Sequence, residues 1–192
     1  MSVRSDDRPG SRGPEGEPLA FFTGAEAAIA EAVMARIFPS DENIPGAPEA
    51  GTVFYLDRAL AGAELHLQGA YRAGLQRLDR IRRSRYGDGF ADCGKVGQDA
   101  LLGAMADGTL SAFGNAPTAL EFFEMLRAHT IEGLFADPVH GGNRNFVGWK
   151  LLGYQGPQPS YSHEEQQLDA VIVRDRIFSA ADYPLSSTAS EK

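Results

Sequence analysis

The chain has 192 residues, of which 43% are hydrophobic and 23% are charged, and its formal net charge at pH 7 is −8. A domain of this size buries enough surface to fold without disulfides or metals, and the single cysteine, Cys93, excludes an internal disulfide and a thiolate-rich metal site. The acidic balance argues against a nucleic-acid partner, and no apolar run approaches the ~20 residues of a transmembrane helix.

The two ends of the chain have the composition of disordered segments. Met1–Pro18 is rich in Gly, Pro, Arg, Asp and Glu and lacks the apolar core of a secretory signal, and residues 186–192 are small and polar. We therefore expect a disordered leader over residues 1–20, a helical domain over 21–162 and a C-terminal extension over 163–192. The apolar residues of the extension pack either on its own domain or on a second chain.

The first predicted helix has a strong start signal. Thr23 is placed to cap the first turn, Glu26 can reach back to the cap from three residues later, and Phe22 stands at the staple position. Small apolar residues then recur every three or four positions up to Phe38, and Pro39 cannot continue the helix. We expect a helix from this cap to about Phe38.

Two further segments follow a loop that contains proline and glycine. Thr52–Leu60 resumes an apolar pattern, which indicates a short helix, with a strand as the alternative. Glu64–Tyr86 has a clear helical period, and its apolar stripe consists of Leu67, Tyr71, Leu75, Leu78 and Ile81. Between Tyr71 and Lys95 seven basic residues stand against three acids. This basic face is either a solvated helix surface, which we favour, or a surface for an acidic partner.

Three more helical segments complete the predicted architecture. One is expected from a cap at Asp92 to Asp107-Gly108, and the next has Pro117 in its first turn and ends near Ala136. A short helical turn is expected over Val147–Leu152, before a loop rich in glycine, proline and aromatic residues. The predicted fold class is all-α: a helical bundle of five or six helices with a long structured C-terminal loop region.

We find no catalytic, cofactor-binding or metal-binding motif in this sequence, whose four histidines are dispersed along the chain. His129 follows the apolar face of its helix, which favours a histidine hydrogen-bonded within the core. The alternative is a stand-alone helical metal-binding protein or enzyme that uses His129, Glu132 and His140. A di-iron bundle would need a Glu-x-x-His pattern on two helices, which the sequence lacks.

The segment Asp137–Lys150 combines turn residues with the only tryptophan. Pro138 ends the preceding helix, and Gly141-Gly142-Asn143 tolerate the positive φ of tight turns. With Arg144, this turn has the residues of an anion cradle. No strand precedes it, so neither the P-loop nor the dinucleotide-binding pattern applies, and we favour a structural turn.

Aromatic residues gather beside the prolines and glycines of the C-terminal third. Such side chains are favoured where one protein buries against another, although a loop that lies on its own bundle also needs aromatic anchors. Because these residues do not form the periodic apolar face of a helix that could pack on the bundle, we predict that they bind a partner chain. The predicted interface residues are Phe146, Trp149, Tyr154, Tyr161, Ile172 and Phe178.

Several of these segments together resemble the gluconate 2-dehydrogenase subunit 3 family over about Phe21–Pro157. The most specific part is Glu132–Pro157. The segments that carry the resemblance are Phe22-Thr23, Ala35–Pro39, Ile44–Ala47, Phe123, Glu132–Pro138, His140–Asn143, Gly148–Lys150 and Gly153–Pro157.

The resemblance implies a noncatalytic small subunit bound to a flavoprotein large subunit of the glucose-methanol-choline oxidoreductase type. It implies that FAD and the catalytic residues belong to that partner, that this chain holds no cofactor, and that the small subunit supports the folding, stability and export of the large one. Relatives of such complexes oxidise a sugar, a sugar acid or a glycoside at a CH-OH group and pass electrons to a cytochrome c or a quinone.

Family members often carry a twin-arginine signal, whereas Met1–Pro18 has neither adjacent arginines nor an apolar core. We therefore expect a cytoplasmic complex, with a periplasmic location as the alternative if the partner carries its own signal.

Overall fold

The computed structural model describes residues 13, 16–172 and 174–183, and this part of the chain is all-α, as predicted. Most of the predicted leader and the tail at 186–192 lie outside these residues. The six α-helices are α1 Gly24–Ile37, α2 Thr52–Ala61, α3 Gln68–Tyr86, α4 Lys95–Ala106, α5 Ala119–Phe135 and α6 Val147–Leu152. Short 3₁₀ turns are η1 Leu65–Leu67, η2 Ser111–Phe113, η3 Pro138–His140, η4 Arg144–Phe146 and η5 Ala180–Asp182. No helix among the described residues has the length and apolar character needed to span a membrane.

The observed helix starts show which local sequence signals were sufficient to predict where a helix begins. Thr23 and Glu26 form the predicted capping box at α1, and the segment from residue 52 is the helix α2 rather than the alternative strand. Two predictions were wrong. The cap of α4 is Gly94 rather than Asp92, and Pro117 precedes the α5 cap rather than lying in its first turn, because Thr118 caps that helix through its own capping box with Glu121.

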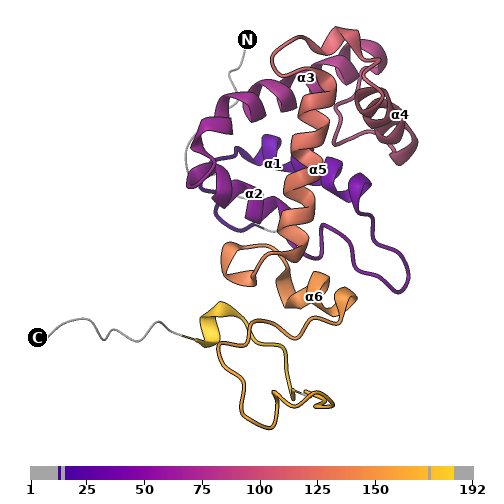
Figure 1. Ribbon diagram of the computed structural model, residues 1–192. Helices are drawn as coiled ribbons and strands as arrows, with labels where there is room; N and C mark the ends of the chain where they lie inside the picture. The colour runs from indigo at the N-terminus through magenta and orange to yellow at the C-terminus, as the bar shows by residue number, and fades with distance from the viewer. Residues whose placement is uncertain (1–12, 14–15, 173, 184–192) are drawn as a thin grey trace, which may run out of the picture.

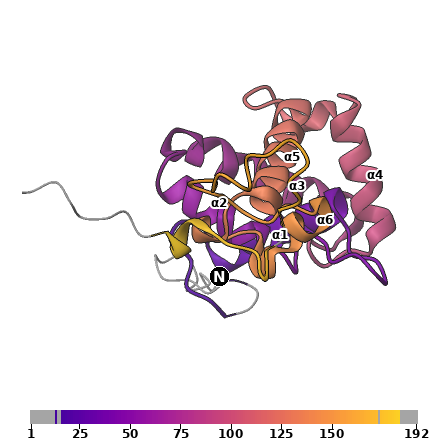
Figure 2. The same cartoon turned by 60° about the horizontal axis from the view of Figure 1, so that its bottom comes forward.

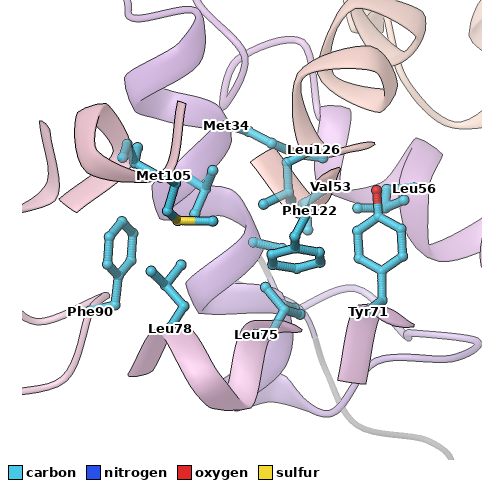
Figure 3. Packing of buried hydrophobic residues seen from close by; sticks show 14 of the residues in the cluster. Met34, Val53, Leu56, Tyr71, Leu75, Leu78, Phe90, Met105, Phe122 and Leu126 are labelled. Atoms are coloured by element: carbon cyan, nitrogen blue, oxygen red, sulfur yellow. The ribbon is translucent and has the colours of Figure 1, made fainter. Parts of the chain in front are cut away.

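Helix α5 runs through the middle of the bundle in Figure 1 and contacts α1, α2, α3, α4 and α6. Its buried side chains Phe122 and Leu126 meet the predicted stripe of α3, where Tyr71 and Leu75 are fully buried (Figure 3). The rings of Tyr71 and Phe122 lie edge to face, with centroids 5.6 Å apart. Burial of each such side chain stabilises the fold by roughly 1.5–3 kcal/mol, so α5 is the centre of the core.

A buried carboxylate fixes how the chain enters α1. Asp57 on α2 is 2% exposed, and its two oxygens accept hydrogen bonds from the backbone N–H groups of Ala20 at 2.7 Å, Phe21 at 3.0 Å and Phe22 at 2.8 Å. Backbone donors that point at one carboxylate form strong, charge-assisted hydrogen bonds. The segment before α1 is therefore held against α2, with Leu19 buried in the core.

The chain after α6 lies below the bundle in Figure 1, and in Figure 2, where the bottom is turned forward, it crosses in front of the helices. Among its described residues the only helical element is η5. The segment folds back on itself, because the Phe178 N–H donates to the Gln155 carbonyl at 3.2 Å. It is also joined to the turn after α5, because the Ala180 N–H donates to the Asp137 carboxylate at 2.7 Å. This arrangement agrees with the predicted long structured loop region.

Candidate functional site

The glycine-rich turn after α5 closes the C-terminal end of that helix. The last carbonyls of a helix lack partners within it, and here two of them and the carbonyl of the next residue are used. Gly133 accepts from the backbone N–H of Asn143 at 2.7 Å, Ala136 just past the helix accepts from the Asn143 amide at 2.9 Å, and Phe135 accepts from the indole N–H of Trp149 at 2.8 Å. The most distinctive stretch of the sequence is thus the cap of the central helix.

Asn143 is the organising residue of this cap. It is fully buried and has a φ of 47°, in the left-handed region that asparagine tolerates better than most residues. Its Oδ1 atom accepts from the backbone N–H of Gly148 at 2.8 Å, while its amide nitrogen donates to the Ala136 carbonyl. One side chain therefore links the end of α5 to the start of α6.

Two glycines let the chain approach α5 closely. A Cβ atom added at Gly142 would lie 2.2 Å from the Gly133 carbonyl oxygen, and one added at Gly148 would lie 1.9 Å from the Leu134 carbonyl oxygen. Both neighbours are backbone atoms of a buried helix end and cannot turn away. The glycines are required here by contact with α5 and not by an exposed turn.

The turn uses its donors internally. The N–H groups of Gly141, Asn143 and Arg144 donate to Pro138, Gly133 and Ala50 respectively, and the Arg144 guanidinium pairs with Glu17 at 2.7 Å and lies 4.0 Å from the centre of the Phe54 ring. These are contacts of a structural turn, the interpretation that the sequence favoured, and not of an anion cradle.

The structure brings three of the six predicted interface residues together. Trp149 is 5% exposed and stacks on Phe146 with centroids 5.6 Å apart, and Tyr154 meets its edge at 5.0 Å. Burial and the bond to Phe135 make Trp149 an anchor of this chain's own fold, whereas Tyr154 is 46% exposed. An interface role for Trp149 stays a prediction.

The other three predicted residues lie in the C-terminal segment. Tyr161 is 51% exposed, Ile172 is half-buried, and Phe178 is half-buried beside Tyr183 and the Arg176 guanidinium. The six predicted interface residues do not include four exposed aliphatic residues that lie near them in the chain. These are Leu151, Leu152, Leu168 and Val171.

The residues of the alternative metal site are not gathered into a cluster. His129 is buried, and its Nδ1 atom lies 2.7 Å from the Tyr71 hydroxyl and 2.8 Å from the Met125 carbonyl. Glu132 accepts from the Tyr55 hydroxyl at 3.0 Å, and His140 is exposed in η3. Over the described part of the chain, no three His, Cys, Asp or Glu side chains are arranged to hold a metal ion. His129 is the core histidine that the sequence favoured.

Most of the basic face of α3 is engaged within the chain. Arg72 pairs with Glu26 at 3.1 Å, Arg83 pairs with Asp79 at 2.7 Å, and Arg77 donates to the Ala116 carbonyl at 3.0 Å. Exposed ion pairs contribute little to stability, but the two pairs neutralise the charges of Arg72 and Arg83. The face therefore fits the solvated helix surface that we favoured.

Asp57 is a buried carboxylate that sequence reasoning missed. The available signal was an acid within the mainly apolar stretch Thr52–Leu60, since a carboxylate on the buried side of a short helix requires hydrogen-bond donors. The donors lie more than 30 residues earlier in the chain, so no local pattern could name them.

A comparison with models of protein families gave a match, which covers the bundle and the α5 cap. The model described as Gluconate 2-dehydrogenase subunit 3 matches residues 24–156, which is well over half of the chain. The chain belongs to the gluconate 2-dehydrogenase subunit 3 family. The matched region begins at the first residue of α1 and ends at Gly156, so it contains the whole bundle and the α5 cap but not the rest of the C-terminal segment.

Neither the search of curated proteins nor that of solved structures found a match to this chain. Membership of a subunit family implies that the chain is an accessory component of a dehydrogenase complex with more than one kind of subunit.

Proposed function

We propose that this chain is a noncatalytic small subunit that binds and stabilises a FAD-dependent large subunit of the glucose-methanol-choline type. In this proposal the large subunit holds the flavin and oxidises a CH-OH group of a sugar, sugar acid or glycoside. Electrons then pass to a cytochrome c or a quinone. The chain contributes binding surface and structural support, and no reacting group.

The observation that carries the proposal is how the family's most distinctive segment is used. Its polar residues cap α5, and α6 is thereby held at the bundle surface with apolar side chains facing outward. Leu152 at the end of α6 is 64% exposed, Tyr154 just beyond it is 46% exposed, and Leu151 is 39% exposed. A rigidly held apolar surface is typical of a protein interface.

Co-production with the flavin-dependent large subunit encoded in the same genome tests the proposal. We expect one complex that contains both chains and shows flavin absorbance in size-exclusion chromatography. A folded, colourless small subunit that elutes alone beside a stable, active flavoprotein would refute it.

A pair of variants locates the interface. Leu152→Asp is expected to weaken the complex because it places a charge on the apolar surface, by about 2 kcal/mol or more if Leu152 is a central contact. The matched control is Val96→Asp at the start of α4, where the side chain is 85% exposed and α4 lies at the far end of the molecule from the C-terminal segment in Figure 1. Equal binding by both variants would exclude α6 from the interface.

The cytoplasmic location expected from the sequence is also a proposal, with the periplasm as the alternative. Fractionation of cells that produce both subunits, followed by detection of this chain in each fraction, decides between them.

A further inference from the structure

The loop 159–172 has an unusual distribution of polar and apolar side chains. Several of its polar side chains bond to other groups of the loop, whereas three of its large apolar side chains are exposed to solvent. Tyr161 is 51% exposed, Val171 is 84% exposed and Leu168 is exposed completely. Single exposed apolar residues are ordinary, but three in one short loop that is held by its own hydrogen bonds require an explanation.

The neck of the loop is closed by Arg174. One guanidinium nitrogen donates to the carbonyls of Gln155 at 3.2 Å and Pro157 at 3.0 Å, and the other donates to the side-chain oxygen of Gln158. Gly156 allows this closure, since it has a φ of 88° and a Cβ there would lie 1.9 Å from the Phe178 carbonyl oxygen. The two ends of the loop are thus fixed to each other and to the cap of α5.

The loop is also held internally. Ser162 and Glu165 exchange hydrogen bonds, with Ser162 N–H donating to the carboxylate at 2.7 Å and Glu165 N–H donating to the hydroxyl at 3.2 Å. Gln166 donates to the Tyr161 carbonyl at 2.9 Å, and Gln167 donates to the His163 carbonyl at 3.0 Å. A loop fixed in this way loses little conformational entropy when it binds.

The charge of residues 151–173 indicates which kind of partner the loop can bind. Residues 151–173 contain three acids, Glu164, Glu165 and Asp169, and no lysine or arginine. Two copies would bring like charges together, on chains that each have a net charge of −8, which disfavours self-association. An apolar groove with basic residues at its rim, on a different protein, would complement both the exposed apolar side chains and the acids of this segment.

We propose that loop 159–172 is a preformed docking loop that inserts Tyr161, Leu168 and Val171 into an apolar groove with a basic rim on the flavoprotein large subunit. The proposal rests on the function proposed above and adds a second contact to the surface around α6. The loop lies beyond the residues 24–156 that match the family. It therefore determines which large subunit this chain selects.

The test measures the affinity of the purified small subunit for the purified large subunit that is encoded in the same genome. Leu168→Ser and Val171→Ser are each expected to raise the dissociation constant at least about tenfold, as the loss of an apolar interface contact does. Val96→Ser on α4 is the matched control, because it makes the same kind of change at an equally exposed site away from the loop, and it is expected to bind as the unaltered chain does. Asp169→Asn is expected to weaken binding at low salt and to reduce its salt dependence.

The outcomes separate the two proposals. If the unaltered chain forms the complex and the loop variants bind equally well, the docking loop is refuted while the accessory function stands. If the unaltered chain does not bind, both proposals fail. Hydrogen exchange on the unaltered complex is the independent measurement: amides of residues 160–172 become protected if the loop docks, and unchanged exchange there refutes it. Concentration-dependent dimerisation of the small subunit that is abolished by Leu168→Ser would assign the loop to a second copy and refute the proposed occupant.

Discussion

Replacing Asn143 with alanine tests whether this residue organises the end of the central helix. The change removes the bond to the Ala136 carbonyl at 2.9 Å and the bond from the Gly148 N–H at 2.8 Å. It also places alanine at a φ of 47°. Each buried polar group left without a partner costs about 1–3 kcal/mol, and the left-handed conformation costs alanine roughly 1–2 kcal/mol.

These contributions sum to a loss of about 3–8 kcal/mol, which is a large part of the roughly 5–15 kcal/mol that stabilises a typical domain. Urea unfolding of the isolated chain measures it. The only tryptophan, Trp149, packs in the same cap, so its fluorescence reports both global unfolding and any local opening of the turn.

Two substitutions divide the loss into its causes. Asn143→Gly keeps the backbone conformation and removes the side-chain bonds, so it measures the hydrogen bonds alone. Asn145→Ala makes the same change at a residue with a φ of 54° that is exposed and whose side chain bonds to no described residue, and it is expected to cost only about 1 kcal/mol. If Asn143→Ala costs no more than Asn145→Ala, the argument that Asn143 organises the cap is refuted.

Three further predictions concern stability and pH. Asp57→Asn should lower the free energy of unfolding by about 2–3 kcal/mol in urea titrations, because an amide cannot accept from three backbone donors as the carboxylate does; an unchanged midpoint would contradict this. Gly148→Ala should destabilise the protein by about 3 kcal/mol, because the added Cβ atom overlaps the backbone of α5. Gly103→Ala in α4, with open space around it, should stabilise the protein by up to about 1 kcal/mol. Calorimetry should therefore show a lower melting point for the first variant and a higher one for the second. Burial and the hydrogen bond to Glu132 raise the pKa of Tyr55 to about 12, so its contribution to stability is complete below the ordinary value of 10 and is lost as the pH rises through 12. Tyr55→Phe should remove this alkaline loss, and an identical stability profile for both proteins would contradict the assignment.

Local signals in the sequence were sufficient for the helices. The capping box of Thr23 and Glu26 could be read directly because its partners are three residues apart, and the stripe of α3 predicted the buried positions Tyr71, Leu75, Leu78 and Ile81 because the helical period repeats within one element. The starts of α4 and α5 were misplaced for different reasons. The cap of α4, Gly94, makes no side-chain hydrogen bond that a sequence pattern could reveal, whereas the capping box of Thr118 and Glu121 at α5 is a local signal that was overlooked.

The resemblance to the subunit family also came from the sequence, through residues 132–157 above all, and the match over residues 24–156 confirmed it. What those residues do was decided by tertiary contact. Whether the turn Gly141–Arg144 cradles an anion or caps a helix depends on which groups its N–H donors meet. Asn143 donates to Gly133 in α5, and Arg144 donates to Ala50, which lies far away in the chain.

The sequence by itself determined the helical segments, the family and the concentration of aromatic residues in the C-terminal third, because each depends on residues close together in the chain. Only the tertiary structure decided that Trp149 is buried while Leu168 and Val171 are exposed, that Asp57 holds the entry to α1, and that Arg174 closes the loop 159–172. These outcomes depend on which distant backbone groups come within hydrogen-bond distance, and no local periodicity encodes that.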